Sequence, residues 1–265
     1  MREDLKIEVL VSTMRRSDCI ALAEKMNIKT KCLIVNQLGD ARSSEKVQVI
    51  NLNEKGLSKS RNECIRRSKA DIGIVADDDL VYVDNYEEIV QNAYKKYKEA
   101  DIIAFEVPST NILRPTSTIK KTKQINFLGS MKLSSFQLTF KLNSLKENNL
   151  YFDELFGAGA KYRMGEENIF LFDCLKKGLK IYFVKEKIAV VNHEESTWFK
   201  GYTKKYFSDL GAIYNRMDTK LGKILLIQFL LRKRKLYLNE IGTLTALKAG
   251  LEGIRKGKAE SNFGE

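Results

Sequence analysis

The sequence contains a single histidine, His193, among its 265 residues. Any mechanism that needs two or more His side chains, such as a His-rich zinc site, is therefore excluded. The four cysteines, at positions 19, 32, 64 and 174, form no CxxC pair, which predicts reduced thiols with structural roles. With only 2 Pro and 16 Gly the chain is not collagen-like, and 43% hydrophobic residues supply the core that a disordered chain lacks.

Long apolar runs are also missing. All of them fall well short of the roughly 20 residues that a membrane-spanning helix needs. Residues 1–6 are mostly charged and contain no apolar signal-peptide core. We therefore expect no transmembrane segment and a cytoplasmic protein.

Positive charge is in excess: 46 Lys and Arg against 34 Asp and Glu leave a formal net charge of +12. Residues 107–146 hold seven basic residues and no acidic one. Residues 216–265 hold 11 basic and 5 acidic residues, a net charge of +6. Such stretches fit solvated surfaces, phosphate contacts, an anionic membrane surface or nucleic acid, and the composition leaves all four open.

Short apolar runs alternate with helix-like segments in the first hundred residues. We expect strands at 7–12, 31–36, 47–50 and 72–76, with helices at 18–26 and 60–69 between them. The second helix is expected to begin at Ser60, because Ser60 and Glu63 have the spacing of a capping box. This pattern predicts an α/β fold with a central, mostly parallel sheet, in which ligands collect at the carboxyl ends of the strands.

The rest of the sequence continues the mixed pattern to about residue 191 and is helical after Gly201. We expect a helix at 84–98, a strand at 101–107, a long loop from Pro108, a strand at 136–140, a helix at 166–177 and strands at 180–184 and 187–191. From Gly201 onward the pattern is helical. The chain is therefore expected to divide into an α/β domain, 1–200, and a helical C-terminal extension, 201–265.

Three consecutive carboxylates, Asp77, Asp78 and Asp79, follow the apolar strand 72–76. Like charges this close destabilise one another unless a cation or hydrogen-bond donors compensate them. Hard oxygen ligands suit Mg²⁺ or Mn²⁺, which commonly bridge carboxylates to a diphosphate. The alternative is an acidic strand-to-helix turn in which Asp79 or Asp84 is an ordinary helix N-cap.

Four blocks stand in order along residues 5–200. They are Gly56–Asn62 (GLSKSRN), Ala70–Asp79 (ADIGIVADDD), Phe152–Gly157 (FDELFG) and Gly165–Asn168 (GEEN). Together they resemble the family two glycosyltransferases of the GT-A fold, as in enzymes of bacterial capsule and exopolysaccharide synthesis. The resemblance implies a Rossmann-like domain that binds a nucleoside-diphosphate sugar, a UDP-sugar before others, through Mn²⁺ or Mg²⁺.

The resemblance also implies roles for individual residues. Asp77 and Asp79 match the carboxylates of the DxD motif, and His193 stands where many GT-A enzymes place a metal-ligating His. An ordinary structural role is the alternative for His193. The residues that match donor-binding positions are Ser12, Thr13, Asn36, Arg61, Asp77 and Asp78.

The proton acceptor is expected in the last block. In inverting members the acidic pair of this block takes the proton from the acceptor hydroxyl, and here the pair is Glu166 and Glu167, with Glu in place of the usual Asp. We assign Glu167 as the general base and Glu166 as its neighbour toward acceptor or backbone. The alternative is that both glutamates only favour the N-terminus of the following helix.

The expected function is metal-dependent, inverting transfer of a sugar to a hydroxyl of a glycan or lipid-linked glycan, as in surface polysaccharide synthesis. A nucleic-acid-binding or nuclease-like metal protein and a nucleotidyltransferase are the alternatives. Nucleic acid is not expected as a partner, because the aromatic residues of this sequence are not interleaved with Lys and Arg as they are in nucleic-acid-binding modules.

Two features of the C-terminal part remain open. The apolar block Ile224–Leu231 precedes the basic cluster Arg232–Lys235, which fits either peripheral attachment to an anionic membrane, at its inner face, or a helix packed on the catalytic domain. Several aromatic residues follow His193 and fit either core or a platform for a sugar ring. These are Trp198, Phe199, Tyr202, Tyr206 and Phe207.

Overall fold

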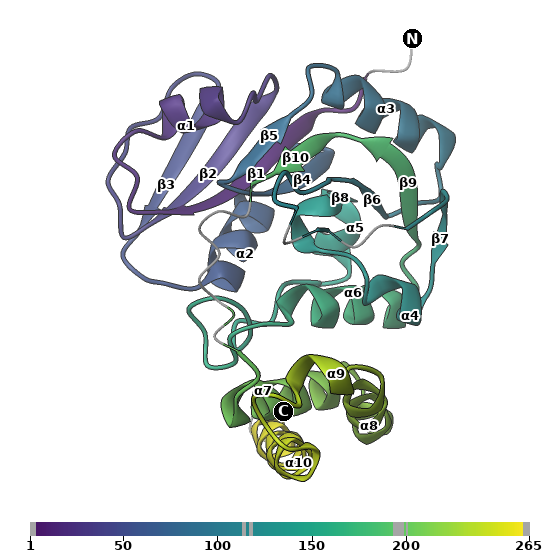
Figure 1. The fold of residues 1–265 in the computed structure, drawn as a ribbon. Coiled ribbons are helices and arrows are strands. Elements are labelled where there is room, and N and C mark those ends of the chain that lie inside the picture. Colours follow the sequence, from purple (N-terminus) through teal and green to yellow (C-terminus); the bar gives the residue numbers. More distant parts are fainter. Residues whose placement is uncertain (1–3, 113–114, 117–118, 193–198, 200, 262–265) are drawn as a thin grey trace. The chain divides into compact units, whose positions relative to one another are not determined.

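The computed structural model describes residues 4–112, 115–116, 119–192, 199 and 201–261. The chain divides into two compact units (Figure 1). One, here the sheet unit, comprises Met1–Phe152 and Phe170–Glu195; the other, the helical unit, comprises Asp153–Ile169 and Ser196–Glu265. The expected domain boundary at residue 200 stays a prediction.

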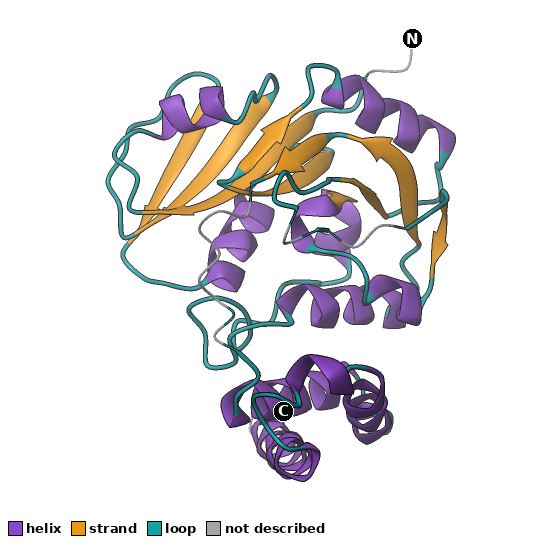
Figure 2. Cartoon of the chain, in the orientation of Figure 1, coloured by secondary structure: helices purple, strands orange, loops and turns teal. Residues whose placement is uncertain are grey.

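The sheet unit is built on one eight-stranded sheet (Figure 2). Its order is β3-β2-β1-β4-β8-β6-β9-β7. Neighbours from β3 to β4 are parallel, as are β6 and β9, whereas β8 is antiparallel to β4 and β6 and β7 is antiparallel to β9. The strands are β1 (Ile7–Met14), β2 (Lys31–Gln37), β3 (Val47–Leu52), β4 (Ile72–Asp77), β6 (Ile102–Glu106), β7 (Lys123–Ile125), β8 (Leu138–Lys141) and β9 (Ile181–Lys187). The expected mostly parallel central sheet and the Rossmann-like α/β fold are confirmed.

Helices cover both faces of this sheet. Successive residues of each strand point to opposite faces, so each strand contributes side chains to two cores. Val9 and Val11 pack with α1 (Cys19–Lys25) and α3 (Tyr86–Lys96). Leu10, between them, belongs to the other core with α2 (Leu57–Arg67), α5 (Leu142–Glu147) and the Phe170–Cys174 part of α6 (Glu166–Lys176). All four cysteines are buried free thiols, as expected.

The chain reverses direction across the sheet at β1. From β1 it runs outward through β2 to β3, then returns to place β4 on the other side of β1. Ligands of open α/β sheets bind at such a switch point, outside the carboxyl ends of the strands. The carboxyl ends of β1 and β4 are therefore the place at which the fold favours a binding site.

Several local predictions were wrong. Helix α2 begins at Leu57 after Gly56, so Ser60 lies inside the helix and is fully buried, and no capping box forms there. The expected long loop after Pro108 contains β7 and α4 (Phe127–Ser130). The strand expected from residue 136 starts at Leu138, because Ser135–Gln137 form a 3₁₀ turn, η1.

A second, small sheet pairs β5 (Leu80–Tyr82) antiparallel with β10 (Ala189–Val191). The sequence reading missed β5. The turn after Asp77 therefore leads into a strand, and α3 begins only at Tyr86 with Asn85 as its N-cap residue. The alternative in which Asp79 or Asp84 caps this helix is wrong.

The helical unit contains α7 (Lys204–Met217), α8 (Gly222–Arg232), α9 (Arg234–Tyr237) and α10 (Thr243–Ser261). Glycines allow α7 and α10 to touch backbone to backbone. A Cβ atom at Gly211 would lie 2.0 Å from the Gly250 carbonyl oxygen, and one at Gly253 would lie 1.9 Å from that of Ser208. Within the described residues, no helix combines the length and apolar character that crossing a bilayer requires.

Candidate active site

The donor-binding residues expected from the sequence gather at the carboxyl ends of β1, β2 and β4. Strand register sets this arrangement, since Ser12 on β1 lies opposite Asp77 on β4 and Thr13 lies opposite Asn36 on β2. The Ser60 hydroxyl of α2 donates a hydrogen bond of 2.9 Å to the Ser12 hydroxyl. Ser12, Thr13 and Asn36 are all buried. Three polar side chains are therefore buried at the carboxyl ends of β1 and β2.

Asp78 is held by hydrogen bonds from β1 and the loop after it. The Thr13 hydroxyl donates to one Asp78 carboxylate oxygen at 2.5 Å, and the Arg16 guanidinium donates to the same oxygen at 2.9 Å. Asn36 in turn fixes the Arg16 backbone, accepting from its N–H at 3.0 Å and donating to its carbonyl at 2.9 Å. The Asn36 amide also donates to Asn51 on β3 at 3.1 Å.

Asp77 is paired with Arg61 of α2. The guanidinium is 3% exposed and donates to Asp77 Oδ1 at 2.9 Å and to the Ser135 hydroxyl at 2.8 Å. Its Cζ atom also lies 5.4 Å from the centre of the Phe152 ring. A buried ion pair costs desolvation, which its hydrogen bonds and the stacked ring partly offset. Arg61 therefore orients the Asp77 carboxylate at the end of β4.

Asp79 differs from Asp77 and Asp78 in the surroundings of its carboxylate. Its Oδ1 atom is buried and accepts no hydrogen bond from the described residues. Burial, followed by the charges of Asp77 and Asp78, raises the pKa of Asp79 to about 7. A cation at this position would remove both penalties, since an opposite charge favours the ionised carboxylate.

The carboxylates at this edge of the sheet are donors of the kind that suits a divalent metal. The donors are carboxylate oxygens, which are the ligands that Mg²⁺ and Mn²⁺ prefer, and the partnerless Asp79 oxygen is a position that a cation would fill. His193, the third expected ligand, lies outside the described residues. The residue before it, Asn192, donates its N–H to the Asp79 carbonyl at 3.0 Å, so the chain reaches Asp79 immediately before His193. Within the described residues, no group of three or more His, Cys, Asp or Glu side chains forms a ready metal site.

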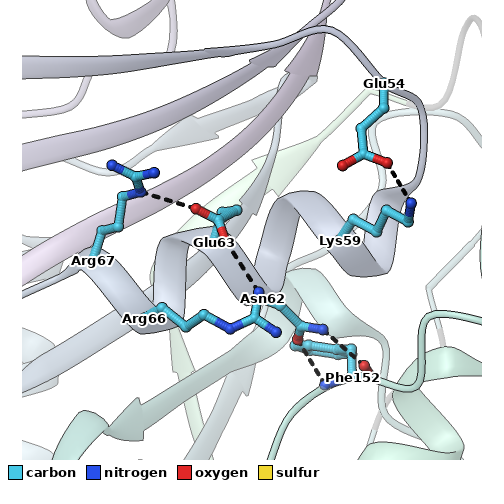
Figure 3. A network of polar contacts seen from close by, with 7 residues as sticks. All are labelled: Glu54, Lys59, Asn62, Glu63, Arg66, Arg67 and Phe152. Carbon is cyan, nitrogen blue, oxygen red and sulfur yellow. Dashed lines mark hydrogen bonds and ion pairs between the residues drawn. The ribbon is translucent and has the colours of Figure 1, made fainter.

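Asn62, next to Arg61 on α2, fixes the segment that carries Phe152 (Figure 3). Its side-chain amide donates to the Phe152 carbonyl at 2.9 Å and accepts from the Phe152 N–H at 2.8 Å. Phe152 also stacks on Phe170, with ring centres 4.3 Å apart. On the outer face of the same helix, Glu63 pairs with Arg66 and Arg67 in solvent (Figure 3). One helix thus supports the Asp77 side chain and pins the backbone at Phe152.

Glu166 and Glu167 form the first turn of α6 within the helical unit. Glu166 is buried, with 7% exposure, and Glu167 is half-buried. The preceding Gly165 has φ +86°, and a Cβ there would lie 2.7 Å from Ile213. Glycine is required for both reasons. The position of the pair in a first turn fits the helix-dipole alternative as well as the catalytic one, so the general base stays a prediction.

A hollow open to solvent lies beside this turn in the helical unit. Asp209 in its wall is buried, pairs with Lys205 and accepts from the Arg163 N–H at 3.4 Å. Of the aromatic residues expected to form core or platform, Phe207 is fully buried, whereas Trp198 lies outside the described residues. The lining residues are Arg163, Met164, Phe199, Gly201, Thr203, Lys205, Tyr206 and Asp209.

Some residues of the site were missed from the sequence. Asn51 stands near the end of β3, so the expectation that ligands collect at the carboxyl ends of the strands could have pointed to it. Arg16 and Ser135 carry no such signal, because the loop and the 3₁₀ turn that bring them to Asp78 and Arg61 are set by the tertiary fold.

Part of the chain is similar to a known protein family. Residues 34–161, just under half of the chain, match the family model described as Glycosyl transferase family 2. Over this stretch the chain carries a glycosyltransferase domain. The matched part of this domain includes Asn36, Arg61 and Asp77–Asp79, and it ends before Glu166 and Glu167. None of the curated proteins matches the sequence.

Solved structures support the fold of the glycosyltransferase domain. The chain is similar to residues 1–349 of TarS from S. aureus, with a TM-score of 0.60, 14% identity, and coverage of 89% of this chain and 74% of that one. The same protein in complex with UDP-GlcNAc matches with a TM-score of 0.61 at 14% identity, over 89% and 74% of the two chains. A longer structure of S. aureus TarS matches with a TM-score of 0.61 at 15% identity, and the match covers 88% of this chain and 44% of that one.

Proposed function

We propose that this chain transfers a sugar from a nucleoside-diphosphate sugar, a UDP-sugar before others, to a hydroxyl of a glycan or lipid-linked glycan. The observation that carries the proposal is the cluster at the switch point. There Asp77 and Asp78 are fixed by Arg61, Thr13 and Arg16, while the buried Asp79 oxygen has no partner among the described residues. TarS, which has a similar fold, is described in complex with UDP and with UDP-GlcNAc.

The protein's own groups suit a nucleotide diphosphate. Ser12 and Thr13 offer hydroxyl groups at the strand ends, where ribose and base can be hydrogen-bonded. Asn36, which is fully buried, would act through Arg16, whose backbone it fixes. Arg16 lies half-exposed beside Asp78 and brings a positive charge to the same edge. Together with Asp78, these side chains would bind and orient the nucleoside.

Asp77, Asp79 and His193 would hold Mn²⁺ or Mg²⁺, and the bound ion would supply positive charge for the leaving diphosphate. Arg61 would hold the Asp77 carboxylate in its orientation through their 2.9 Å ion pair. The buried Oδ1 atom of Asp79 is out of contact with water, so it would gain most from the ion.

Glu167 would act as the general base of an inverting transfer, taking the proton of the acceptor hydroxyl, with Glu166 beside it. The hollow next to Gly165 is our proposed acceptor side. Phe199 and Tyr206 in its wall offer ring faces on which a sugar can stack, and Thr203 and Lys205 offer hydrogen bonds. Surface polysaccharide synthesis is the setting that this donor and acceptor fit.

A pair of variants tests these roles. Glu167→Gln keeps the size of the side chain and removes the base, so turnover should fall by at least about 100-fold with donor affinity unchanged. Asp79→Ala should instead remove metal-dependent donor binding. Turnover within about two-fold of wild type in Glu167→Gln would move the base elsewhere, and full metal-dependent activity in Asp79→Ala would refute the metal site.

A further inference from the structure

Exposed apolar side chains concentrate in the C-terminal part of the helical unit. Of the fifteen large hydrophobic residues exposed in the described part of the chain, eight lie between residues 221 and 251. Single exposed hydrophobics are ordinary, whereas a group of them marks a surface that contacts something apolar. The eight are Leu221, Ile224, Ile227, Leu231, Leu236, Leu238, Leu244 and Leu251.

Helix α8 has two apolar faces. Leu225, Leu226 and Leu230 are buried within the helical unit, where Leu226 packs against Gly250 of α10. Ile224, Ile227 and Leu231, at spacings of three and four, share the opposite face and are 61%, 48% and 68% exposed. Packing inside the helical unit therefore accounts for one face and leaves the other in solvent.

Cations border this exposed face. Arg232 ends α8, Lys233 joins it to α9, and Arg234 and Lys235 begin α9; all four are exposed. None of the four makes an ion pair with a carboxylate of the described residues, whereas Glu252 pairs with Lys256 and Glu240 accepts from the Tyr202 N–H. The basic turn is held in place by Tyr237, which is fully buried and donates from its hydroxyl to the Leu230 carbonyl at 2.8 Å.

Helix α10 repeats the pattern on its exposed side. Leu244, Lys248, Leu251 and Arg255 are spaced by four, three and four residues and are all exposed. Apolar and basic side chains thus alternate on one face of α10, and Glu252 of the same helix is paired with Lys256.

We propose that the exposed face of α8, with the basic turn Arg232–Lys235, docks on an anionic lipid surface. Apolar side chains enter the interface between headgroups and acyl chains, while the Lys and Arg side chains bind lipid phosphates. Charge selects this occupant: the segment 216–265 carries a net charge of +6, and an apolar protein partner would give the four cations no counter-charge. The docking is independent of sugar transfer, so its failure would leave the proposed reaction untouched.

Sedimentation of the full chain with vesicles tests the docking. The protein should co-sediment with phosphatidylcholine vesicles that contain phosphatidylglycerol and remain in solution with phosphatidylcholine alone. Ile224→Ser with Leu231→Ser should lower partitioning at least about ten-fold, because two apolar side chains lose their burial. Lys233→Gln with Lys235→Gln should lower it about thirty-fold, since each cation near such a surface contributes about five-fold.

The matched control replaces two exposed apolar residues of the sheet unit. Ile112 and Leu128 are 92% and 63% exposed, and changing both to Ser should leave partitioning within about two-fold of wild type. UDP binding should be the same in all these variants, which separates docking from donor binding. Absence of binding to anionic vesicles, equal binding to neutral ones, or an equal loss in the control would overturn the proposal. So would a dimer, measured by light scattering, that the Ile224→Ser, Leu231→Ser variant dissociates without a change in vesicle binding.

Discussion

Replacing Asn62 with Ala should lower the free energy of unfolding of the sheet unit by about 3 kcal/mol. The side-chain amide of Asn62 makes two buried hydrogen bonds, of 2.9 and 2.8 Å, with the carbonyl and the N–H of Phe152. Truncation leaves both backbone groups without a partner, at a cost of about 1–3 kcal/mol each. The higher helix propensity of Ala returns roughly 0.5 kcal/mol.

Urea unfolding followed by circular dichroism measures the change. With a slope of about 1–3 kcal/mol per molar urea, the midpoint should fall by at least about 1 M. The control is Glu63→Ala on the same helix, which removes solvent-exposed pairs with Arg66 and Arg67 at 3.1 and 2.9 Å and should cost less than about 1 kcal/mol. Equal midpoints for the two variants would refute the reasoning.

A second substitution at the same position separates the hydrogen bonds from simple packing. Asn62→Asp keeps the size of the side chain, and the introduced carboxyl can donate to the Phe152 carbonyl only while it is protonated. The variant should therefore approach wild-type stability as pH falls below the pKa of that carboxyl. A destabilisation that is the same at pH 5 and pH 8 would contradict the hydrogen-bond account.

Two further predictions concern other parts of the chain. Gly253→Ala should destabilise the helical unit by about 1–3 kcal/mol, because the new Cβ would meet the Ser208 carbonyl oxygen at 1.9 Å, whereas Gly242→Ala, with no atom within 4 Å, should be neutral in the same thermal melt. In metal-free protein Asp79→Asn should raise the melting temperature at pH 8. Folding raises the pKa of Asp79 to about 7 from 3.8, so the wild type loses stability as pH rises from about 4 to 7, and the gain from Asn should shrink as pH is lowered through that range.

The sequence predicts well which residues end the first strands of the sheet, because strand ends are local consequences of an apolar pattern. Four β-branched runs were enough to place Ser12, Thr13, Asn36 and Asp77 at one edge. Both-face burial also followed from the near-continuous apolar character of these strands.

The sequence failed where tertiary contacts decide the local structure. Ser60 has the spacing of a cap, but its hydroxyl bonds to Ser12 inside the sheet unit, so the helix starts one turn earlier. Strand β5 has three residues and exists through its pairing with β10, more than 100 positions away. Ser135 reaches Arg61 across 74 positions, which no local pattern records.

Nucleotide binding in the presence and absence of Mn²⁺ tests the central claim most directly. A thermal-shift panel of UDP, GDP and CMP would measure it, since a ligand at 100 times its Kd stabilises the folded protein by about 2.7 kcal/mol. We predict stabilisation by UDP that requires Mn²⁺ and is absent in Asp79→Ala. No stabilisation by any of the three nucleotides, or an equal effect in Asp79→Ala, would contradict the account.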